Sequence, residues 1–80
     1  MTREEIMLKV QEIFREVFDD EEIILTEETS SADLEEWDSI EHINIVLQLE
    51  QSFGIKIDMG EVVTLNTLGN IVNVIENKLA

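Results

Sequence analysis

Eighty residues suffice for one small domain, residues 1–80, with a thin margin of buried surface and no room for a cleft between two subdomains. The absence of cysteine excludes disulfides, thiolate metal sites and a cysteine nucleophile. The formal net charge is −14, and no Lys or Arg lies between Arg15 and Lys56, which argues against a nucleic-acid ligand and favours a basic protein partner.

The first predicted element is a helix from about Arg3 to Phe18. Thr2 and Glu5 have the spacing of a capping box at its start. Apolar residues then recur at helical spacing, namely Ile6, Val10, Ile13, Phe14, Val17 and Phe18. The acidic run at positions 19–22 predicts the end of this helix, because negative charge is unfavourable near a helix C-terminus.

Residues 19–38 show no sustained period and predict a loop that is long for so small a chain. Its few apolar residues lie at Ile23–Leu25, Leu34 and Trp37. We expect these residues to pin the loop to the core, and we expect Trp37 to be a packing residue.

The second predicted helix runs from Ser39 to about Phe53, with Gly54 as its C-terminal stop. Asp38 or Ser39 can cap it, and Glu41 completes a capping-box pattern with Asp38. The helix carries two apolar stripes, although a surface helix needs only one. We expect Ile45, Val46, Leu49 and Phe53 to be buried, and at least part of the second stripe to be an exposed partner surface, namely Ile40, Ile43 and Leu47.

Two further helices are predicted after Gly54. Residues Ile55–Ile57 alternate like a strand but are too short to build a sheet, and Asp58 opens a short helix through Val63. Asn66 or Thr67 caps the last helix, whose single apolar stripe consists of Leu68, Ile71, Val72, Ile75 and Leu79. The predicted fold is all-α, with three main helices, one short helix and a long first loop.

Ser39 is the candidate functional residue, because its hydroxyl lies at a helix N-terminus, where free N–H groups and the helix dipole favour a phosphate. The alternative is a plain helix cap. His42, the only histidine, lies one turn further on and is expected at the core boundary without facing the hydroxyl. We therefore expect no catalytic residues, and the acidic run lacks the pattern of a calcium loop, so we expect no metal site.

Three motifs resemble those of the acyl carrier proteins, and the resemblance extends from Ile6 to Leu79. Asp38-Ser39-Ile40 resembles the Asp-Ser-Leu motif of that family. Residues 49–57, Leu-Glu-Gln-Ser-Phe-Gly-Ile-Lys-Ile, resemble its Leu-Glu-x-x-Phe-Gly-Ile-x-Ile segment. Residues 67–72, Thr-Leu-Gly-Asn-Ile-Val, resemble the opening of its last helix. The order and spacing of these motifs match the family.

The resemblance implies a four-helix bundle of the acyl-carrier type with 4′-phosphopantetheine attached to Ser39. Such a carrier holds acyl groups as thioesters on the flexible arm, and in the family the acyl chain can fold back between the helices. The carrier itself is not an enzyme. Because this chain has no thiol of its own, the prosthetic group has to supply one.

The resemblance also implies partners, namely a phosphopantetheinyl transferase and acyltransferases, synthases or ligases with basic docking surfaces. The partner-binding residues are expected to be Asp38, Ile40, Glu41, Ile43 and Leu47. The apolar runs are short and no signal peptide is recognisable, so we expect a cytoplasmic monomer without a membrane span.

Several functions stay open from the sequence. The cargo can belong to fatty-acid synthesis or to a specialised acyl or polyketide pathway, since Asn44, Gln48, Gln51 and Asn70 replace residues that are usually more acidic in fatty-acid carriers. A D-alanyl or aminoacyl carrier is one alternative. A second alternative is an acidic helical interaction module that carries nothing and docks a basic partner through the stripe of Ile40, Ile43 and Leu47.

Overall fold

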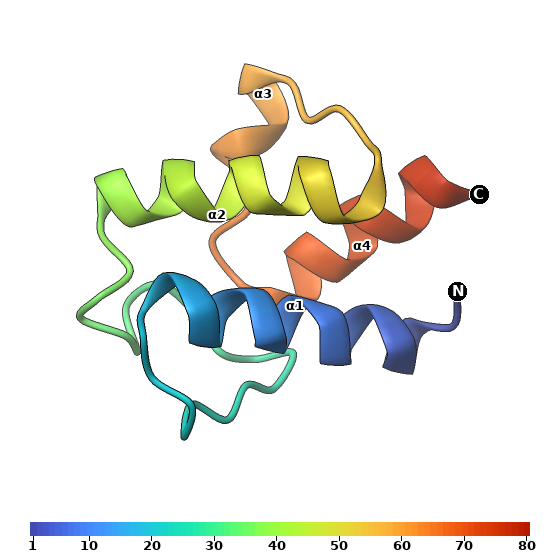
Figure 1. The fold of residues 1–80 in the computed structure, drawn as a ribbon. Coiled ribbons are helices and arrows are strands. Elements are labelled where there is room, and N and C mark those ends of the chain that lie inside the picture. The colour runs from blue at the N-terminus through green and yellow to red at the C-terminus, as the bar shows by residue number, and fades with distance from the viewer.

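The computed structural model describes all residues from 1 to 80 as four helices connected by loops, without a β-sheet (Figure 1). The helices are α1 (Arg3–Val17), α2 (Ser39–Phe53), α3 (Met59–Val62) and α4 (Leu68–Leu79). The predicted all-α class, with three main helices and a short one, is confirmed. Phe18 is the C-cap of α1 and Val63 that of α3, so both helices end one residue earlier than predicted.

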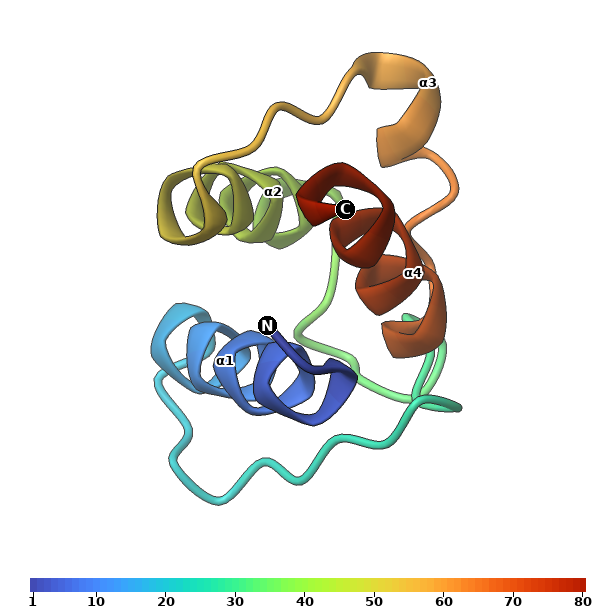
Figure 2. The ribbon, with the colours of Figure 1, turned by 90° about the vertical axis from the view of Figure 1, so that its right-hand side faces the viewer.

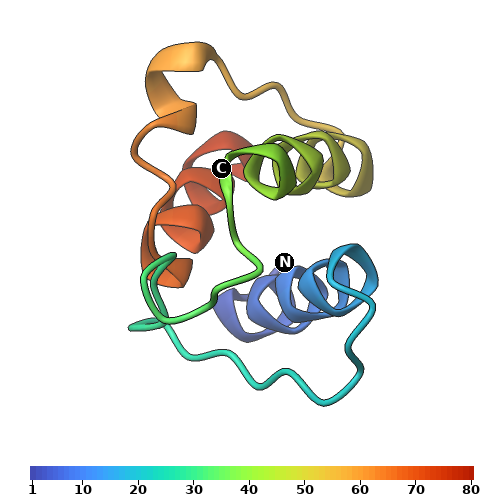
Figure 3. The same ribbon diagram turned by 90° about the vertical axis from the view of Figure 1, so that its left-hand side faces the viewer.

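The three long helices surround one core. Helices α1 and α2 run antiparallel, and α4 closes the third side, as the end-on views show (Figures 2 and 3). The short helix α3 lies at the edge, beside α2 and α4 (Figure 2). The N-terminus of α1 and the C-terminus of α4 lie at the same end of the molecule (Figure 1).

The core is entirely apolar, and its helical members follow the predicted stripes. The long helices contribute Ile6, Val10, Ile13, Phe14, Ile45, Val46, Leu49, Leu68, Ile71, Val72 and Ile75. The connecting segments add Ile23, Leu25, Trp37, Ile57 and Leu65. Burial of these side chains therefore favours folding, and the indole N–H of Trp37 is the one polar side-chain group among them.

Three apolar residues of the predicted stripes and the loop are not fully buried. Phe53 is only half-buried, because it lies in the last turn of α2, and the Lys9 ammonium lies 5.1 Å from the centre of its ring. Leu79, the last residue of α4, is 40% exposed. Ile24 is 80% exposed because it points away from the core between its buried neighbours Ile23 and Leu25. The prediction that Phe53 is buried is wrong, and so is the prediction that Ile24 helps to pin the loop to the core.

The long loop between α1 and α2 packs against the start of α4. The Leu68 and Gly69 N–H groups donate to the carbonyls of Thr29 and Glu27 at 2.9 Å each. A side chain at position 69 would bring a Cβ atom within 3.1 Å of the Glu27 carbonyl oxygen, so the glycine permits this close approach. The loop is thereby pinned by its backbone as well as by its predicted apolar residues.

Helix α3 is joined to α4 by side chains. The Lys78 ammonium lies 2.8 Å from a Glu61 carboxylate oxygen. Glu61 also closes a capping box with Asp58, as the sequence predicts. The hydrogen bond from Lys78, followed by that from the Asp58 backbone, lowers the pKa of Glu61 below its usual 4.5.

This lowered pKa predicts a pH dependence for Glu61→Gln. A carboxyl group with a lowered pKa in the folded state contributes stability above its unfolded pKa and loses it as the pH falls through the folded value. The melting temperature of the wild type should therefore exceed that of Glu61→Gln near pH 7, and the gap should close well below pH 4.5. Thermal melts followed by circular dichroism at low protein concentration, because the pI is about 4.1, measure this gap. A gap that stays constant from pH 7 to pH 3 would contradict the prediction.

Candidate functional site

Ser39 is the first residue of α2, and its side chain is exposed. The residue that caps the helix is Asp38, whose carboxylate accepts a hydrogen bond from the Glu41 N–H at 2.9 Å. Glu41 does not complete the predicted capping box, because its carboxylate accepts a hydrogen bond from the Asn44 amide at 2.7 Å. The hypothesis that Ser39 is a plain helix cap is therefore wrong, and its hydroxyl is not committed to capping.

The start of α2 favours an anion on Ser39. The N–H groups of Ser39 and Ile40 belong to the first turn, where a helix has no internal acceptor for them. These groups and the positive end of the helix dipole stabilise negative charge at that point. The adjacent acidic side chains, Asp38 and Glu41, act in the opposite sense and leave the rim of the site attractive to cationic side chains.

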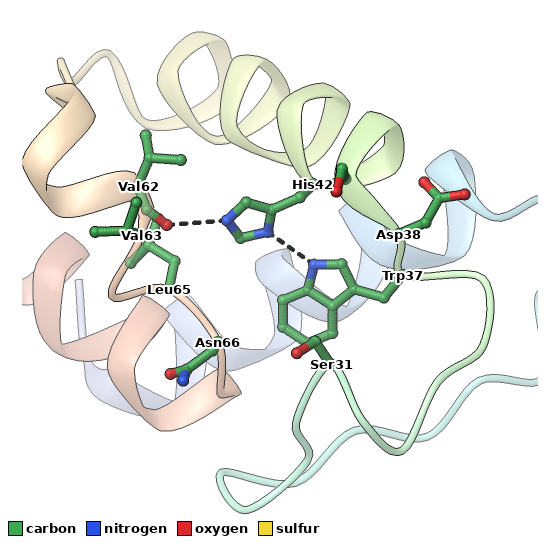
Figure 4. Close-up of a pocket in the computed structure, with 9 residues that line it drawn as sticks. Ser31, Trp37, Asp38, His42, Val62, Val63, Leu65 and Asn66 are labelled. Atoms are coloured by element: carbon green, nitrogen blue, oxygen red, sulfur yellow. Dashed lines mark hydrogen bonds between the residues drawn. The ribbon is translucent and has the colours of Figure 1, made fainter.

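A pocket of about 360 Å³ lies beside Ser39, between the start of α2 and the segment around the end of α3 (Figure 4). It is lined by Ser31, Trp37, Asp38, Ser39, His42, Val62, Val63, Leu65 and Asn66. The lining combines the apolar residues Val62, Val63 and Leu65 with the polar residues Ser31 and Asn66, while the Asp38 carboxylate caps α2. Val62, Val63, Leu65 and Asn66 could not be connected with Ser39 from the sequence, because only the fold brings them together.

His42 joins two walls of this pocket (Figure 4). The Trp37 indole N–H donates to His42 Nδ1 at 2.8 Å, and His42 Nε2 lies 3.0 Å from the Val62 carbonyl oxygen. Since an indole nitrogen only donates and a carbonyl only accepts, the ring carries its proton on Nε2. Both ring nitrogens are thus engaged away from Ser39, so the imidazole has no free nitrogen with which to act as its base.

His42 lies at the core boundary and Trp37 lies in the core, as predicted, but the hydrogen bond between them was not predicted. Trp37 is 5% exposed and its ring lies edge-on to Phe14, with centroids 5.0 Å apart. A buried indole needs an acceptor for its N–H group, and His42 on the next turn is within reach. A tryptophan five residues before the only histidine is therefore the sequence signal that could have predicted this hydrogen bond.

The second apolar stripe of α2 is exposed, as predicted. Ile40, Ile43 and Leu47 are 72%, 58% and 50% exposed. Of the other residues expected to bind partners, Asp38 is exposed and Glu41 is half-buried. The structure also exposes the apolar residues Met59 and Val63 at the two ends of α3, which the sequence analysis did not single out.

The rest of the chain contains no grouping of three or more acidic or histidine side chains arranged to hold a metal ion. None of the four helices has the length and apolar character that crossing a membrane requires.

Comparisons with known proteins agree with this geometry. Residues 8–75 match the family model described as the phosphopantetheine attachment site. The chain is 37% identical to the acyl carrier protein of Thermotoga maritima over 78 residues, which cover 98% of this chain and 96% of that one. It is 34% identical to the meromycolate extension acyl carrier protein of Mycobacterium leprae over 76 residues, 95% of this chain and 66% of the relative.

A solved structure is also similar. The solution structure of the holo acyl carrier protein from Geobacter metallireducens superposes with a TM-score of 0.85 and 40% identity, and the match covers 91% of this chain and 84% of that one. The family match spans most of the sequence, and the fold matches that of a solved member. The chain therefore belongs to the acyl carrier proteins.

Proposed function

We propose that Ser39 carries the 4′-phosphopantetheine of this acyl carrier protein and that residues 1–80 form a single carrier domain. One observation supports the attachment site above all others. Ser39 is exposed at the first position of α2, while the neighbouring Asp38 caps the helix and leaves the serine hydroxyl available. The phosphodiester would lie against the first-turn N–H groups of α2, which stabilise its charge.

The residues around Ser39 fit the prosthetic group. Phosphopantetheine is the group that this family carries, and it supplies the thiol that forms the thioester with the acyl cargo. The chain itself has no cysteine. The pocket beside Ser39 offers apolar contacts from Val62, Val63 and Leu65 and polar contacts from Ser31 and Asn66, a combination that suits an arm with amide groups. As a member of this family the protein is a carrier and not an enzyme.

Carriers of this family work with transferases and synthases. For this chain we propose that a phosphopantetheinyl transferase, and acyltransferases, synthases or ligases with basic docking surfaces, bind Asp38, Ile40, Glu41, Ile43 and Leu47. The exposed apolar stripe supplies contact area, and the adjacent carboxylates steer a cationic surface. The cytoplasmic location and the monomeric state stay predictions, which cell fractionation and size-exclusion chromatography test.

The experiment for the attachment site uses coenzyme A and a phosphopantetheinyl transferase of broad specificity. We expect the mass of one phosphopantetheine to be added, and fragmentation of the modified peptide to place it on Ser39. Modification that maps to Ser30, Ser31 or Ser52 would contradict the assignment. A protein that gains no mass would instead support the alternative of an interaction module without cargo.

A further inference from the structure

We infer that Trp37 and His42 close the route from Ser39 into the helical core, so that this carrier holds a short or polar acyl group in the surface pocket. The inference rests on the proposed attachment at Ser39. It concerns the class of cargo and differs from the behaviour that the family resemblance implies, in which the acyl chain folds back between the helices.

Trp37 forms the inner wall of the pocket beside Ser39. Its ring is 5% exposed and lies edge-on to Phe14, which is fully buried in α1. On one side of the indole is the pocket, and on the other is the core. An acyl chain that starts at Ser39 and enters the core through this wall therefore has to displace the indole.

The indole is held in place by His42. The two rings are stacked, with centroids 5.8 Å apart and an angle of 28° between their planes. The hydrogen bonds from Trp37 to His42 and from His42 to the Val62 carbonyl form a continuous bridge from the start of α2 to the end of α3. Moving Trp37 away from His42 would leave the buried indole N–H without an acceptor. An unsatisfied buried donor costs free energy, because it has lost its hydrogen bond to water as well.

Helix α3 is also tied to α4, so the pocket does not widen easily on that side. Lys78 pairs with Glu61 at 2.8 Å, and the Asn70 side chain donates to the Thr64 carbonyl at 3.0 Å. Together with the bond from His42 to Val62, these contacts attach the segment 61–64 to both of its neighbouring helices. Separation of α3 from the bundle would break three polar contacts at once.

The pocket that remains suits a small cargo. Its volume of about 360 Å³ lies near the lower end of the range for ligand sites, roughly 300–1,000 Å³, and a prosthetic arm on Ser39 would share this space with its cargo. The polar residues Ser31 and Asn66 are among those that line it, whereas the Asp38 carboxylate is engaged as the cap of α2. A long alkyl chain here would stay largely in contact with water, which is unfavourable for apolar surface. A short or hydroxylated acyl group has little apolar surface, so its exposure costs little free energy.

The test compares acyl lengths on the same protein. Acetyl, butyryl and octanoyl coenzyme A, with the transferase, load the wild type, and the mass and the mapped peptide first establish that Ser39 is modified. If the protein is not loaded at Ser39, the proposed attachment site is contradicted. That result would not bear on whether Trp37 and His42 close the route into the core. Burial of only two methylene groups would raise the melting temperature by roughly 6–12 °C.

We expect the acetyl and octanoyl forms to melt together and to share one emission spectrum of Trp37, the only tryptophan. An octanoyl form that melts about 5 °C or more above the acetyl form, with a shifted tryptophan emission, would overturn the inference, because such a gain needs buried methylene groups.

His42→Ala tests the bridge directly, with Gln48→Ala on the exposed face of α2 as its matched control. Loss of the bridge should let the octanoyl chain displace Trp37, so the octanoyl form of His42→Ala should melt above its acetyl form. Gln48→Ala should show no such difference. An equal melting temperature for both acyl forms of His42→Ala would contradict the role of the bridge. If His42→Ala does not fold, the comparison of acyl lengths on the wild type decides the inference alone.

Discussion

Ser39→Ala should reduce phosphopantetheine transfer to zero while the protein stays folded. The hydroxyl oxygen of Ser39 is the atom that would form the phosphodiester, and an alanine at this position has no oxygen with which to form it. The helix should persist because its N-cap is Asp38 and because alanine is a good helix former. Intact mass after incubation with coenzyme A and the transferase measures the transfer, and circular dichroism measures the helix content.

Ser52→Ala is the matched control for this experiment, since Ser52 is a serine of the same helix that lies outside the pocket beside Ser39. It should be modified as fast as the wild type, and its melting temperature should change little, as for most surface substitutions. Modification of Ser39→Ala would rule out the assignment. A large drop in its melting temperature would instead mean that the Ser39 hydroxyl stabilises the start of α2.

The second large effect is the contrast between the two stripes of α2. Leu49 is fully buried, and Leu49→Ala should cost about 2–5 kcal/mol of stability and lower the melting temperature by roughly 10–30 °C. Ile43 is 58% exposed, and Ile43→Ala should cost about 0.5 kcal/mol or less. Denaturant titration of the two variants measures this difference in the free energy of unfolding.

The rates should show the opposite order. Ile43→Ala should slow transfer of phosphopantetheine, because a few apolar anchors at the centre of an interface carry much of its binding energy. Leu49→Ala, assayed below its melting temperature, should be modified at nearly the normal rate. Glu41→Gln should lower the association rate at low salt, and this effect should fade as salt screens the charges. A variant Ile43→Ala that is unstable but modified normally would place this stripe in the core.

The helices could be predicted from the sequence because their stripes, caps and stops are local features. Thr2 and Glu5 close their capping box, and Gly54 ends α2 with a backbone φ of +63°, a left-handed conformation that glycine adopts without strain. The exposed stripe could be predicted as well, since a helix with two apolar faces in a small chain cannot bury both.

The parts that could not be predicted depend on contacts between distant segments. Phe53 and Leu79 fit their stripes but lie in the last turns of α2 and α4, where the neighbouring helices do not cover them. The pocket beside Ser39 takes a wall from residues 62–66, which no local pattern connects with position 39. The hydrogen bond between Trp37 and His42 could be predicted in part, because the two residues are close in the sequence. The Val62 carbonyl that accepts from His42 is distant in the sequence and could not be predicted.

The packing of the long loop on α4 has a consequence for how this scaffold can be redesigned. The carbonyls of Glu27 and Thr29 satisfy first-turn N–H groups of α4, while no loop carbonyl does the same for the Ser39 and Ile40 N–H groups at the start of α2. A designer who replaced residues 19–36 with a short Gly-Ser linker would remove these acceptors and uncover the start of α4. In the shortened carrier, the N-termini of both α2 and α4 would have N–H groups without acceptors. A phosphate would then have two helix N-termini to bind, and the start of α2 would no longer be the preferred one.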